Sequence, residues 1–332
     1  MPGTDAADNV GFLLPQLGRD PADVAARAED LGYDSVWLGE LWFTASPVKL
    51  AQIVERTETV DVGSAILNTY SRSPAVLAMT AATLHRDSGG RFNLGLGTST
   101  PKAVEDLHGM DFDDPNPARR LHECVELCRE FFTGAGRVDY DGQVFHAADF
   151  PALGSDVPIY AAALGTANRR VVARLCDGWI PHNVPFPDLA ESFDYIREHT
   201  PDERDADDIS VAPYVPAAVD EDPAEARDAI RGHVAYYVGN GEGYRRAVAS
   251  RFPEGAEAVA EAWRSGERAA AREAVTDEMV DALGIAGTPE EAREQFDELC
   301  AMDVLDQPLV TIPQDASGVL DATIEALAPA NR

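Results

Sequence analysis

The chain has 332 residues, 58 acidic and 27 basic, and its formal charge of −31 disfavours nucleic acid as a partner because most of the surface would repel phosphates. The hydrophobic fraction of 45% is enough to fill a core, which excludes the disorder that often accompanies a strong acidic charge. No apolar run reaches the roughly 18 residues of a membrane span, and residues 1–9 lack the basic and apolar regions of a signal peptide, so we expect a cytoplasmic protein with no membrane partner.

Short β-branched or apolar runs alternate along the chain with longer segments of helical periodicity. This alternation is typical of βα units around a parallel sheet. Eight strands with intervening helices favour a closed (β/α)8 barrel, the TIM barrel, over an open doubly wound sheet. The expected strands cover residues 10–14, 35–38, 60–67, 92–96, 157–161, 178–180, 209–215 and 309–312.

Three segments exceed a minimal barrel, and we interpret them as insertions in a single domain that spans residues 1–332. The first covers about residues 98–117, after the fourth strand. The second, about residues 137–150, includes an expected hairpin with a two-residue turn at Asp141-Gly142. The third, about residues 239–287, contains helical patterns over 256–263 and 268–283, which indicates helices rather than a linker.

The four cysteines lack the paired C-x-x-C spacing of a zinc site. Cys124 and Cys128 share one face of an expected helix with Leu121 and Phe132. We therefore interpret them as small buried hydrophobic residues and expect neither a metal site nor a disulfide.

In a parallel barrel, functional side chains lie where the strands end and in the loops that follow. The second strand is followed by Gly39-Glu40-Leu41-Trp42-Phe43, in which an acid stands among apolar and aromatic residues. A carboxyl group in such surroundings can act as an acid or a base, so Glu40 is the candidate catalytic residue. A helix cap or a salt bridge at the barrel rim is the alternative.

The third and fourth strands are followed by small and polar residues, over positions 68–74 and 95–99. Glycine lets a ligand approach the backbone, and hydroxyl and amide groups supply hydrogen bonds without a fixed charge. Ser73-Pro74 can also be a helix N-cap and first helical position, and Gly95-Leu96-Gly97 a simple tight turn.

The fifth strand is followed by Ala163-Leu164-Gly165-Thr166, which leads into a helix. The N–H groups and dipole of such a helix terminus suit a phosphate group. Arg169 and Arg170 stand in the first turn, where a cation is unfavourable unless an anion binds nearby. Plain capping remains the alternative.

In combination, these segments resemble the bacterial-luciferase-like superfamily, and within it the branch that uses the deazaflavin F420. Residues 62–74 resemble the pattern of methylenetetrahydromethanopterin reductase and F420-dependent alcohol dehydrogenase. The resemblance covers nearly the whole chain. Its further segments, in order, are Ser88-Gly89-Gly90-Arg91 with Gly95-Leu96-Gly97, Pro158-Ile159-Tyr160 with Gly165, Cys176-Asp177-Gly178, and Gly287-Thr288-Pro289-Glu290-Glu291.

The resemblance implies an F420-dependent oxidoreductase that transfers a hydride between the deazaflavin and a small organic substrate. It also implies a non-proline cis peptide bond at Ala65-Ile66, beneath the deazaflavin ring. The loop 163–166 would hold the phosphate. The expected cofactor-binding residues are Gly39, Ala65, Ile66, Asn68, Gly97, Thr98, Ser99, Ala163, Leu164, Gly165 and Thr166.

The chain departs from this family after the second strand, where many F420 relatives carry Asp-His and this chain has Glu40-Leu41. Leucine cannot transfer a proton, so the reactions of the alcohol and sugar-phosphate dehydrogenases do not carry over directly. Glu40 remains to polarise the ring or move a proton, and Trp42 and His182 are expected to contact the substrate. A loop hydrogen bond is the alternative role of His182.

Two other functions stay open. One is an FMN-dependent monooxygenase of the same superfamily, and the other is a non-catalytic flavin- or F420-binding protein, suggested by the absent histidine. Leu13-Leu14 stands where the methanopterin reductases carry a glutamate, which counts against that substrate. The resemblance also implies a homodimer formed through helices next to the second to fourth strands.

Lysine is nearly absent, since Lys49 and Lys102 are the only two in the chain. An acid-rich, lysine-poor surface over a core of ordinary composition suggests a halophilic protein from a cytoplasm of high salt, where self-repulsion is screened.

Overall fold

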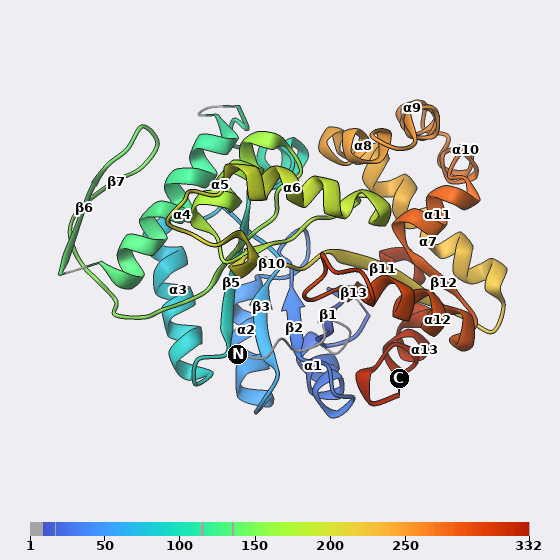
Figure 1. Ribbon diagram of the computed structural model, residues 1–332, viewed down its shortest axis with the longest axis horizontal. Helices are drawn as coiled ribbons and strands as arrows, with labels where there is room; N and C mark the ends of the chain where they lie inside the picture. Colours follow the sequence, from blue (N-terminus) through green and yellow to red (C-terminus); the bar gives the residue numbers. More distant parts are fainter. Residues whose placement is uncertain (1–8, 17, 114–115, 135, 332) are drawn as a thin grey trace.

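Parallel strands run through the centre of the molecule, and helices cover their outer face (Figure 1). The computed structural model describes residues 9–16, 18–113, 116–134 and 136–331. Within these residues, no helix is long and apolar enough to cross a membrane. The strands of the central sheet are β1 (Gly11–Leu13), β2 (Ser35–Leu38), β3 (Asp61–Ser64), β4 (Leu67–Asn68), β5 (Phe92–Gly97), β8 (Ile159–Ala161), β9 (Gly178–Trp179), β10 (Ser210–Val211), β11 (Tyr214–Val219), β12 (Ile285–Gly287) and β13 (Leu309–Thr311).

The sheet closes through one short stretch of chain. β10 pairs with β9, and β11, which follows β10 after Ala212 and Pro213, pairs with β13 on the other side. The N–H of Tyr214 donates to the Pro181 carbonyl at 2.9 Å, and the N–H of Leu309 donates to the Pro213 carbonyl at 2.8 Å. β10 and β11 therefore act as one seventh strand, interrupted at a proline that has no N–H to give. The predicted (β/α)8 barrel with helical insertions is confirmed.

Two strands differ from the prediction. The strand expected over residues 60–67 is split into β3 and β4 at Ala65 and Ile66, which are joined by a cis peptide bond as the resemblance implies. β12 was not predicted, because three residues between two helices are too few to show a strand period. It pairs with the second half of β11, beyond the residues that pair with β13.

The hairpin also differs from its prediction. Its strands are β6 (Arg137–Asp141) and β7 (His146–Pro151), and the turn runs from Gly142 to Phe145 instead of the two residues Asp141-Gly142. The reason is Glu123, a fully buried carboxylate that accepts hydrogen bonds from the N–H groups of residues 143, 144 and 145. The wider turn presents these three N–H groups to a single side chain.

The barrel helices begin where the sequence indicates. Ser73 caps α3, with its hydroxyl accepting a hydrogen bond from the N–H of Val76, and Pro74 takes the first position. Cys124 and Cys128 are fully buried on α4, as expected. These helices are α1 (Pro21–Asp30), α2 (Ser46–Arg56), α3 (Pro74–Asp87), α4 (Pro117–Thr133), α5 (Thr166–Leu175), α6 (Leu189–His199), α12 (Pro289–Cys300) and α13 (Leu320–Ala326).

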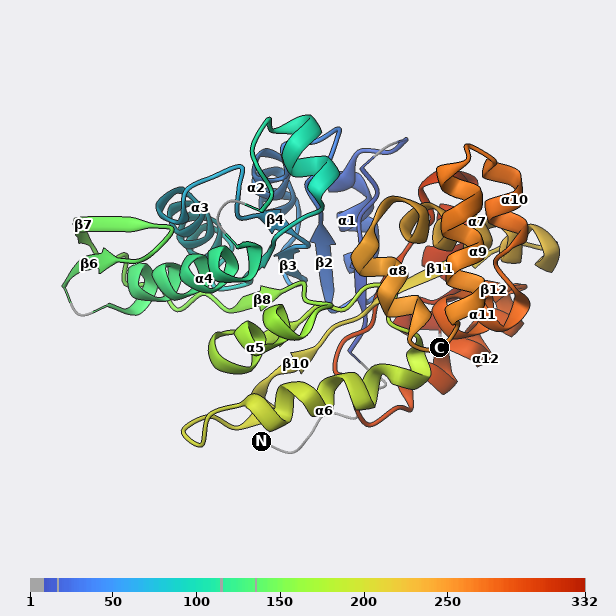
Figure 2. The same cartoon turned by 90° about the horizontal axis from the view of Figure 1, so that it is seen from above.

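The long insertion is helical, as predicted, and has its own apolar core. Its helices are α8 (Glu242–Ala249), α9 (Pro253–Arg264), α10 (Arg268–Glu273) and α11 (Asp277–Leu283), and they pack with α7 (Pro223–Asn240). Buried residues of this core include Val234, Val259 and Met279. The insertion and the β6–β7 hairpin lie at opposite ends of the molecule in both views (Figures 1 and 2). The barrel rim lies between them.

Candidate functional site

The predicted site residues lie at adjoining strand ends, on the edge of the barrel that we call the rim. The N–H of Glu40 donates to the Ile66 carbonyl at 3.3 Å, and Asn68 is the strand partner of Gly97. β8 stands next to β5, and β9 stands next to β8. In ring order the rim carries Gly39 and Glu40 after β2, residues 65–68 from β3 to β4, residues 97–99 from β5, residues 163–166 after β8, and His182 after β9.

We call the segment Ala65-Ile66, which joins β3 to β4, the floor of this rim. A side chain at Gly39 would place its Cβ 2.7 Å from the Ala65 carbonyl oxygen, and one at Gly97 would place it 3.0 Å from Ile66. Gly39 therefore needs glycine, because a backbone oxygen stands in the way of a side chain, whereas a side chain at Gly97 would press on the Ile66 side chain. The Ala65 carbonyl accepts a hydrogen bond from the hydroxyl of Tyr214, the first residue of β11.

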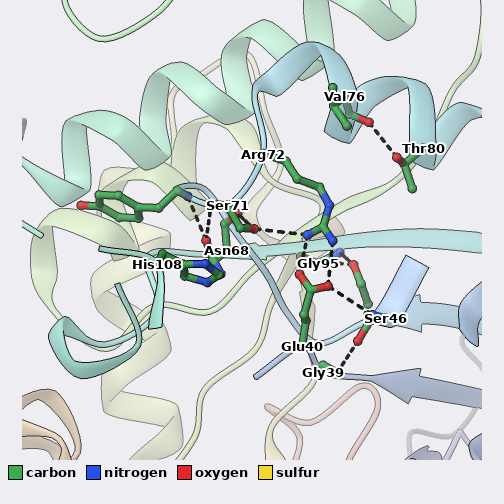
Figure 3. Close-up of polar contacts among 12 residues, drawn as sticks. Gly39, Glu40, Ser46, Asn68, Ser71, Arg72, Val76, Thr80, Gly95 and His108 are labelled. Atoms are coloured by element: carbon green, nitrogen blue, oxygen red, sulfur yellow. Dashed lines mark hydrogen bonds and ion pairs between the residues drawn. The ribbon is translucent and has the colours of Figure 1, made fainter. Parts of the chain in front are cut away.

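Glu40 forms a two-pronged ion pair with Arg72, which lies in the loop before α3 (Figure 3). One guanidinium nitrogen donates to Oε1 at 2.8 Å and the other to Oε2, and the N–H of Ser46 donates to Oε1 at 3.2 Å. The Glu40 side chain is 11% exposed and that of Arg72 is 22% exposed. The hydrogen bonds to Glu40 raise the pKa of Arg72. This is the rim salt bridge that stood as the alternative, and a catalytic role of Glu40 stays a prediction.

Asn68 shapes the loop after β4 (Figure 3). Its Oδ1 accepts hydrogen bonds from the N–H groups of Tyr70 at 3.0 Å and Ser71 at 2.7 Å. Its Nδ2 lies 3.3 Å from Nε2 of His108, which belongs to the insertion after β5. Asn68 is nearly fully buried, so both ends of the amide are used to fix the loop on the rim.

The loop after β8 leads into α5 with Gly165 at the N-cap. Gly165 has no side chain to cap the first turn, and apart from its chain neighbours no described residue lies within 4 Å of the position that its Cβ would take. The Arg169 guanidinium donates to the carbonyl oxygens of Leu164 at 2.9 Å and Ser192 at 3.1 Å. Arg169 therefore holds the loop in shape, and no side chain caps the first turn of α5.

The substrate-side candidates lie on different parts of the rim. His182 is buried after β9, and its Nε2 lies 3.1 Å from Nε2 of His233 on α7. Trp42 is partly exposed in the bend after Glu40. Of the expected cofactor-binding residues after β5, Thr98 is partly exposed and Ser99 has a positive φ of 61°. The His182 contact joins the barrel to the insertion.

Two open surface hollows lie away from the rim. The larger, about 480 Å³, is lined by Lys49, Arg56 and other residues of α1 and α2, and the other, about 260 Å³, lies between α7 and α12. Their linings are charged surface side chains, so neither is a site for a flavin-type ring.

Several rim residues escaped the sequence reasoning. Arg72, His108, Tyr214 and His233 all contact a predicted site residue or its backbone. Arg72 stood within a singled-out segment, but its partner is 32 residues away and no local pattern predicts the pair. His233 lies within the regular period of α7, where a histidine carries no signal of its own.

The family model described as luciferase-like monooxygenase matches residues 14–304. The chain belongs to the luciferase-like monooxygenase family. Within this family, a 5,10-methylenetetrahydromethanopterin reductase of Archaeoglobus fulgidus is 32% identical over 285 residues, which cover 82% of this chain and 83% of the reductase. A Mycobacterium tuberculosis protein that carries the name of a coenzyme F420-dependent oxidoreductase is 29% identical over 326 residues, covering 88% of this chain and 92% of its own.

Solved structures of the family share the fold. The coenzyme F420-dependent tetrahydromethanopterin reductase of Methanopyrus kandleri has a TM-score of 0.80 and 26% identity, with 96% of this chain and 97% of that one covered. An F420-dependent secondary alcohol dehydrogenase, solved with an F420-acetone adduct, has a TM-score of 0.75 over 98% of this chain and 99% of its own. At 18% identity, the second likeness shows the fold alone.

The rim fits a phosphorylated ring cofactor in three respects. Gly97 leaves room beside Ile66, where a Cβ would intrude. The open space at Gly165 lies next to the uncapped first turn of α5, which suits a phosphate. The Thr69 hydroxyl is buried and has no hydrogen-bond partner among the described residues, which leaves a polar atom near the floor for a ligand.

Proposed function

We propose that this protein is an F420-dependent oxidoreductase that transfers a hydride between the deazaflavin and a small organic substrate above the barrel rim. The observation that carries the proposal is the meeting of the Ala65-Ile66 floor, Gly97 and the uncapped start of α5 at one edge of the barrel. The identity with F420-named relatives over most of the chain supports the choice of a deazaflavin over FMN.

The chain's own residues would bind and orient the cofactor. The N–H groups of Thr166 and its neighbours in α5 would hold the phosphate, and the Gly39, Ala65, Ile66 and Gly97 backbone would support the ring. Residues 98–99 and 163–164, with the Asn68 loop, would line its edges and exclude water. Bound F420 supplies a carbon that takes or gives a hydride.

The contacts of Glu40 indicate that it positions the neighbouring loop. Because it accepts hydrogen bonds from Arg72 and from the N–H of Ser46, its carboxylate fixes the loop that follows the floor. We keep Glu40 as the candidate that acts on the ring by its charge. Replacing it with Gln tests this: a loss of kcat at unchanged F420 affinity supports a catalytic role, and a loss of affinity alone assigns it to loop positioning.

Cofactor reconstitution tests the function. The purified protein is titrated with F420 and, in parallel, with FMN, and binding is followed by absorbance and fluorescence. We expect tight binding of F420. We also expect an organic substrate either to reduce the bound F420 or to oxidise its reduced form. Oxygen-dependent turnover with reduced FMN would establish the monooxygenase alternative instead, and tight F420 binding without any hydride exchange would establish the non-catalytic alternative.

We propose a homodimer formed through α2 and α3. Val48 on α2 is 63% exposed, and Val76 and Met79 on α3 are 42% and 41% exposed, which is unusual for three large apolar side chains on neighbouring helices. Light scattering of the wild-type protein is expected to give twice the chain mass, and Val76→Arg to give one chain mass. A wild-type monomer at micromolar concentration contradicts the dimer.

We also propose that the protein is halophilic and works in the cytoplasm. The net charge is −31 and the chain has only two lysines, so its carboxylates repel one another in dilute buffer. At molar salt this repulsion is screened within a few ångströms. Unfolding in urea is compared in dilute buffer and in 2 M KCl with the same protein. Equal stability and F420 binding in both solutions would remove the basis for a halophilic habitat.

A further inference from the structure

A group of neutral aromatic side chains lies where the rim meets the insertion, and we call it the His/Tyr cluster. It consists of His182 after β9, Tyr214 on β11, His233 and Tyr237 on α7, and Tyr244 on α8. The ring of His182 contacts the other four, with centroid distances of 4.7 Å to Tyr214, 5.4 Å to His233, 4.2 Å to Tyr237 and 5.3 Å to Tyr244. His182 is therefore the centre of the cluster.

The two histidines share one close contact between ring nitrogens. Nε2 of His182 lies 3.1 Å from Nε2 of His233, and each residue is only 7% exposed. At this distance one nitrogen must carry a hydrogen and the other a lone pair, because two N–H groups would repel each other. The contact thus holds a single shared proton.

The surroundings keep this pair neutral. Burial lowers the pKa of His182 well below its ordinary value, helped by His233, and lowers the pKa of His233 to about 3. The groups that face the pair from β11, α7 and α8 are tyrosines, and burial raises the pKa of each of them, that of Tyr244 to about 12. No carboxylate among the described residues forms an ion pair with either histidine.

The cluster reaches both the floor of the site and a polar group that lacks a partner. Tyr214 contacts His182 with its ring and donates its hydroxyl proton to the Ala65 carbonyl. Asn183 follows His182 directly, is only 4% exposed, and finds no hydrogen-bond partner for Oδ1 or Nδ2 in the part of the chain that the structure describes. A buried amide with both ends unsatisfied is costly, so a ligand that donates and accepts hydrogen bonds would stabilise it.

We propose that His182 is a catalytic residue that exchanges a proton with the substrate, and that His233 relays this proton to and from water. The inference rests on the proposed F420-dependent hydride transfer. Glu40 is held in its ion pair and Leu41 has no exchangeable proton, so the rim needs another proton donor. The substrate at this end is an uncharged carbonyl compound or its alcohol, because the cluster offers only neutral partners.

The proton balance in the reducing direction is as follows. Reduced F420 would supply a hydride to the carbonyl carbon, the electron pair of the C=O bond would move to oxygen, and that oxygen would take a proton from Nδ1 of His182. Nε2 of His182 takes the shared proton from Nε2 of His233, and Nδ1 of His233 takes a proton from water. Both imidazoles end neutral, one water has lost a proton, and the alcohol has gained a hydride and a proton.

The activity test uses the F420-loaded protein and three uncharged probes: acetone, cyclohexanone and benzaldehyde. We expect His182→Gly to lower kcat by on the order of 100-fold, with F420 affinity within about twofold of wild type, and added imidazole to restore part of the loss. His233→Asn is expected to lower kcat by about tenfold and to enlarge the solvent isotope effect. His146→Gln, on the exposed β7, is the matched control and leaves kcat unchanged.

A second measurement does not depend on turnover. Nitrogen-15 NMR of histidine-labelled protein is expected to show two neutral imidazoles at pH 5.5 that share one hydrogen, and each single variant should change the signal of the other ring. Ordinary titration near pH 6.5 by either ring overturns the relay. So does a wild-type kcat in His182→Gly, or a protein whose reduced F420 passes its hydride to another organic substrate but to none of the three probes. Failure to bind F420, or binding without any hydride exchange, instead overturns the proposed function.

Discussion

Glu40 and Arg72, on the β2–β3 side of the rim, neutralise one another through two hydrogen bonds, whereas His182 and His233, near β9 and β11, share one contact without a charged partner. A paired charge is fixed in place, because separating it from its partner in a half-buried site costs free energy. A neutral imidazole pair can change which nitrogen carries the proton at little cost. The first region is therefore suited to positioning and the second to proton exchange.

The largest loss of stability is expected when the Glu40–Arg72 ion pair is broken. Arg72→Met leaves the Glu40 carboxylate, 11% exposed, without its guanidinium partner. We expect the free energy of unfolding to fall by about 3 kcal/mol, because an unpaired buried charge is costly. Urea unfolding at pH 7.5 measures the loss.

The matched control combines this change with Glu40→Gln, which removes the charge that Arg72 leaves behind. We expect the double variant to recover at least half of the lost stability. If the losses in free energy of unfolding of the two single variants simply add, the ion pair contributes nothing to stability. Glu40 and Arg72 would then not differ from the histidine pair in the way we describe.

A smaller effect is expected from Asn68→Ala, which removes the acceptor for the N–H groups of Tyr70 and Ser71. Two unsatisfied donors in this buried loop should cost about 2 kcal/mol and weaken F420 binding. His108→Ala is the control, because it removes only the partner of Asn68 Nδ2 and leaves the acceptor oxygen in place. Equal losses in both variants would show that the His108 contact, not the loop, is the important one.

The neutral region should appear in the pH dependence of stability. Burial lowers the pKa of His182 and His233 from the ordinary 6.5, so below pH 6.5 the unfolded chain takes up protons that the folded protein refuses. The stabilisation present above pH 6.5 is lost as the pH falls, by about 1.4 kcal/mol for each pH unit and each imidazole.

Urea unfolding of wild type and His233→Phe between pH 7.5 and 5.5 checks this expectation. The carboxylates titrate alike in both proteins, so their contribution cancels in the difference. We expect a shallower loss in the variant and a wild-type slope in His146→Gln, whose ring is exposed. Identical slopes in all three proteins would mean that the His182–His233 pair is not held neutral.

The smallest effect is expected from Tyr214→Phe, which keeps the ring beside His182 and removes the hydrogen bond to the Ala65 carbonyl. A single hydrogen bond of this kind contributes about 1 kcal/mol. Stability should fall by that amount, with a change in F420 affinity, while Tyr195→Phe on α6 should alter neither. An unchanged F420 affinity in Tyr214→Phe would show that the hydrogen bond between the His/Tyr cluster and the Ala65 carbonyl does not affect cofactor binding.

The sequence predicted which residues lie at the rim better than it predicted their hydrogen-bond partners. Strand ends with glycine or a lone acid, such as Gly97 and Glu40, stand out locally, and barrel geometry brings them to one edge. The partners Arg72 and His233 depend on distances between segments far apart in the chain, which periodicity does not encode. The turn at Gly142 was misjudged for the same reason, because Glu123 on α4 widens it.

Strand β11, the second part of the seventh barrel strand, pairs both within the barrel and at the base of the insertion. The first half of β11 forms the barrel wall with β13, and its second half pairs with β12 at the base of the insertion. Tyr214 opens that strand and touches both His182 and the Ala65 carbonyl. Any tilt of the insertion must therefore bend β11 or move Tyr214 with it, so this strand links the position of the insertion helices to the Ala65 carbonyl.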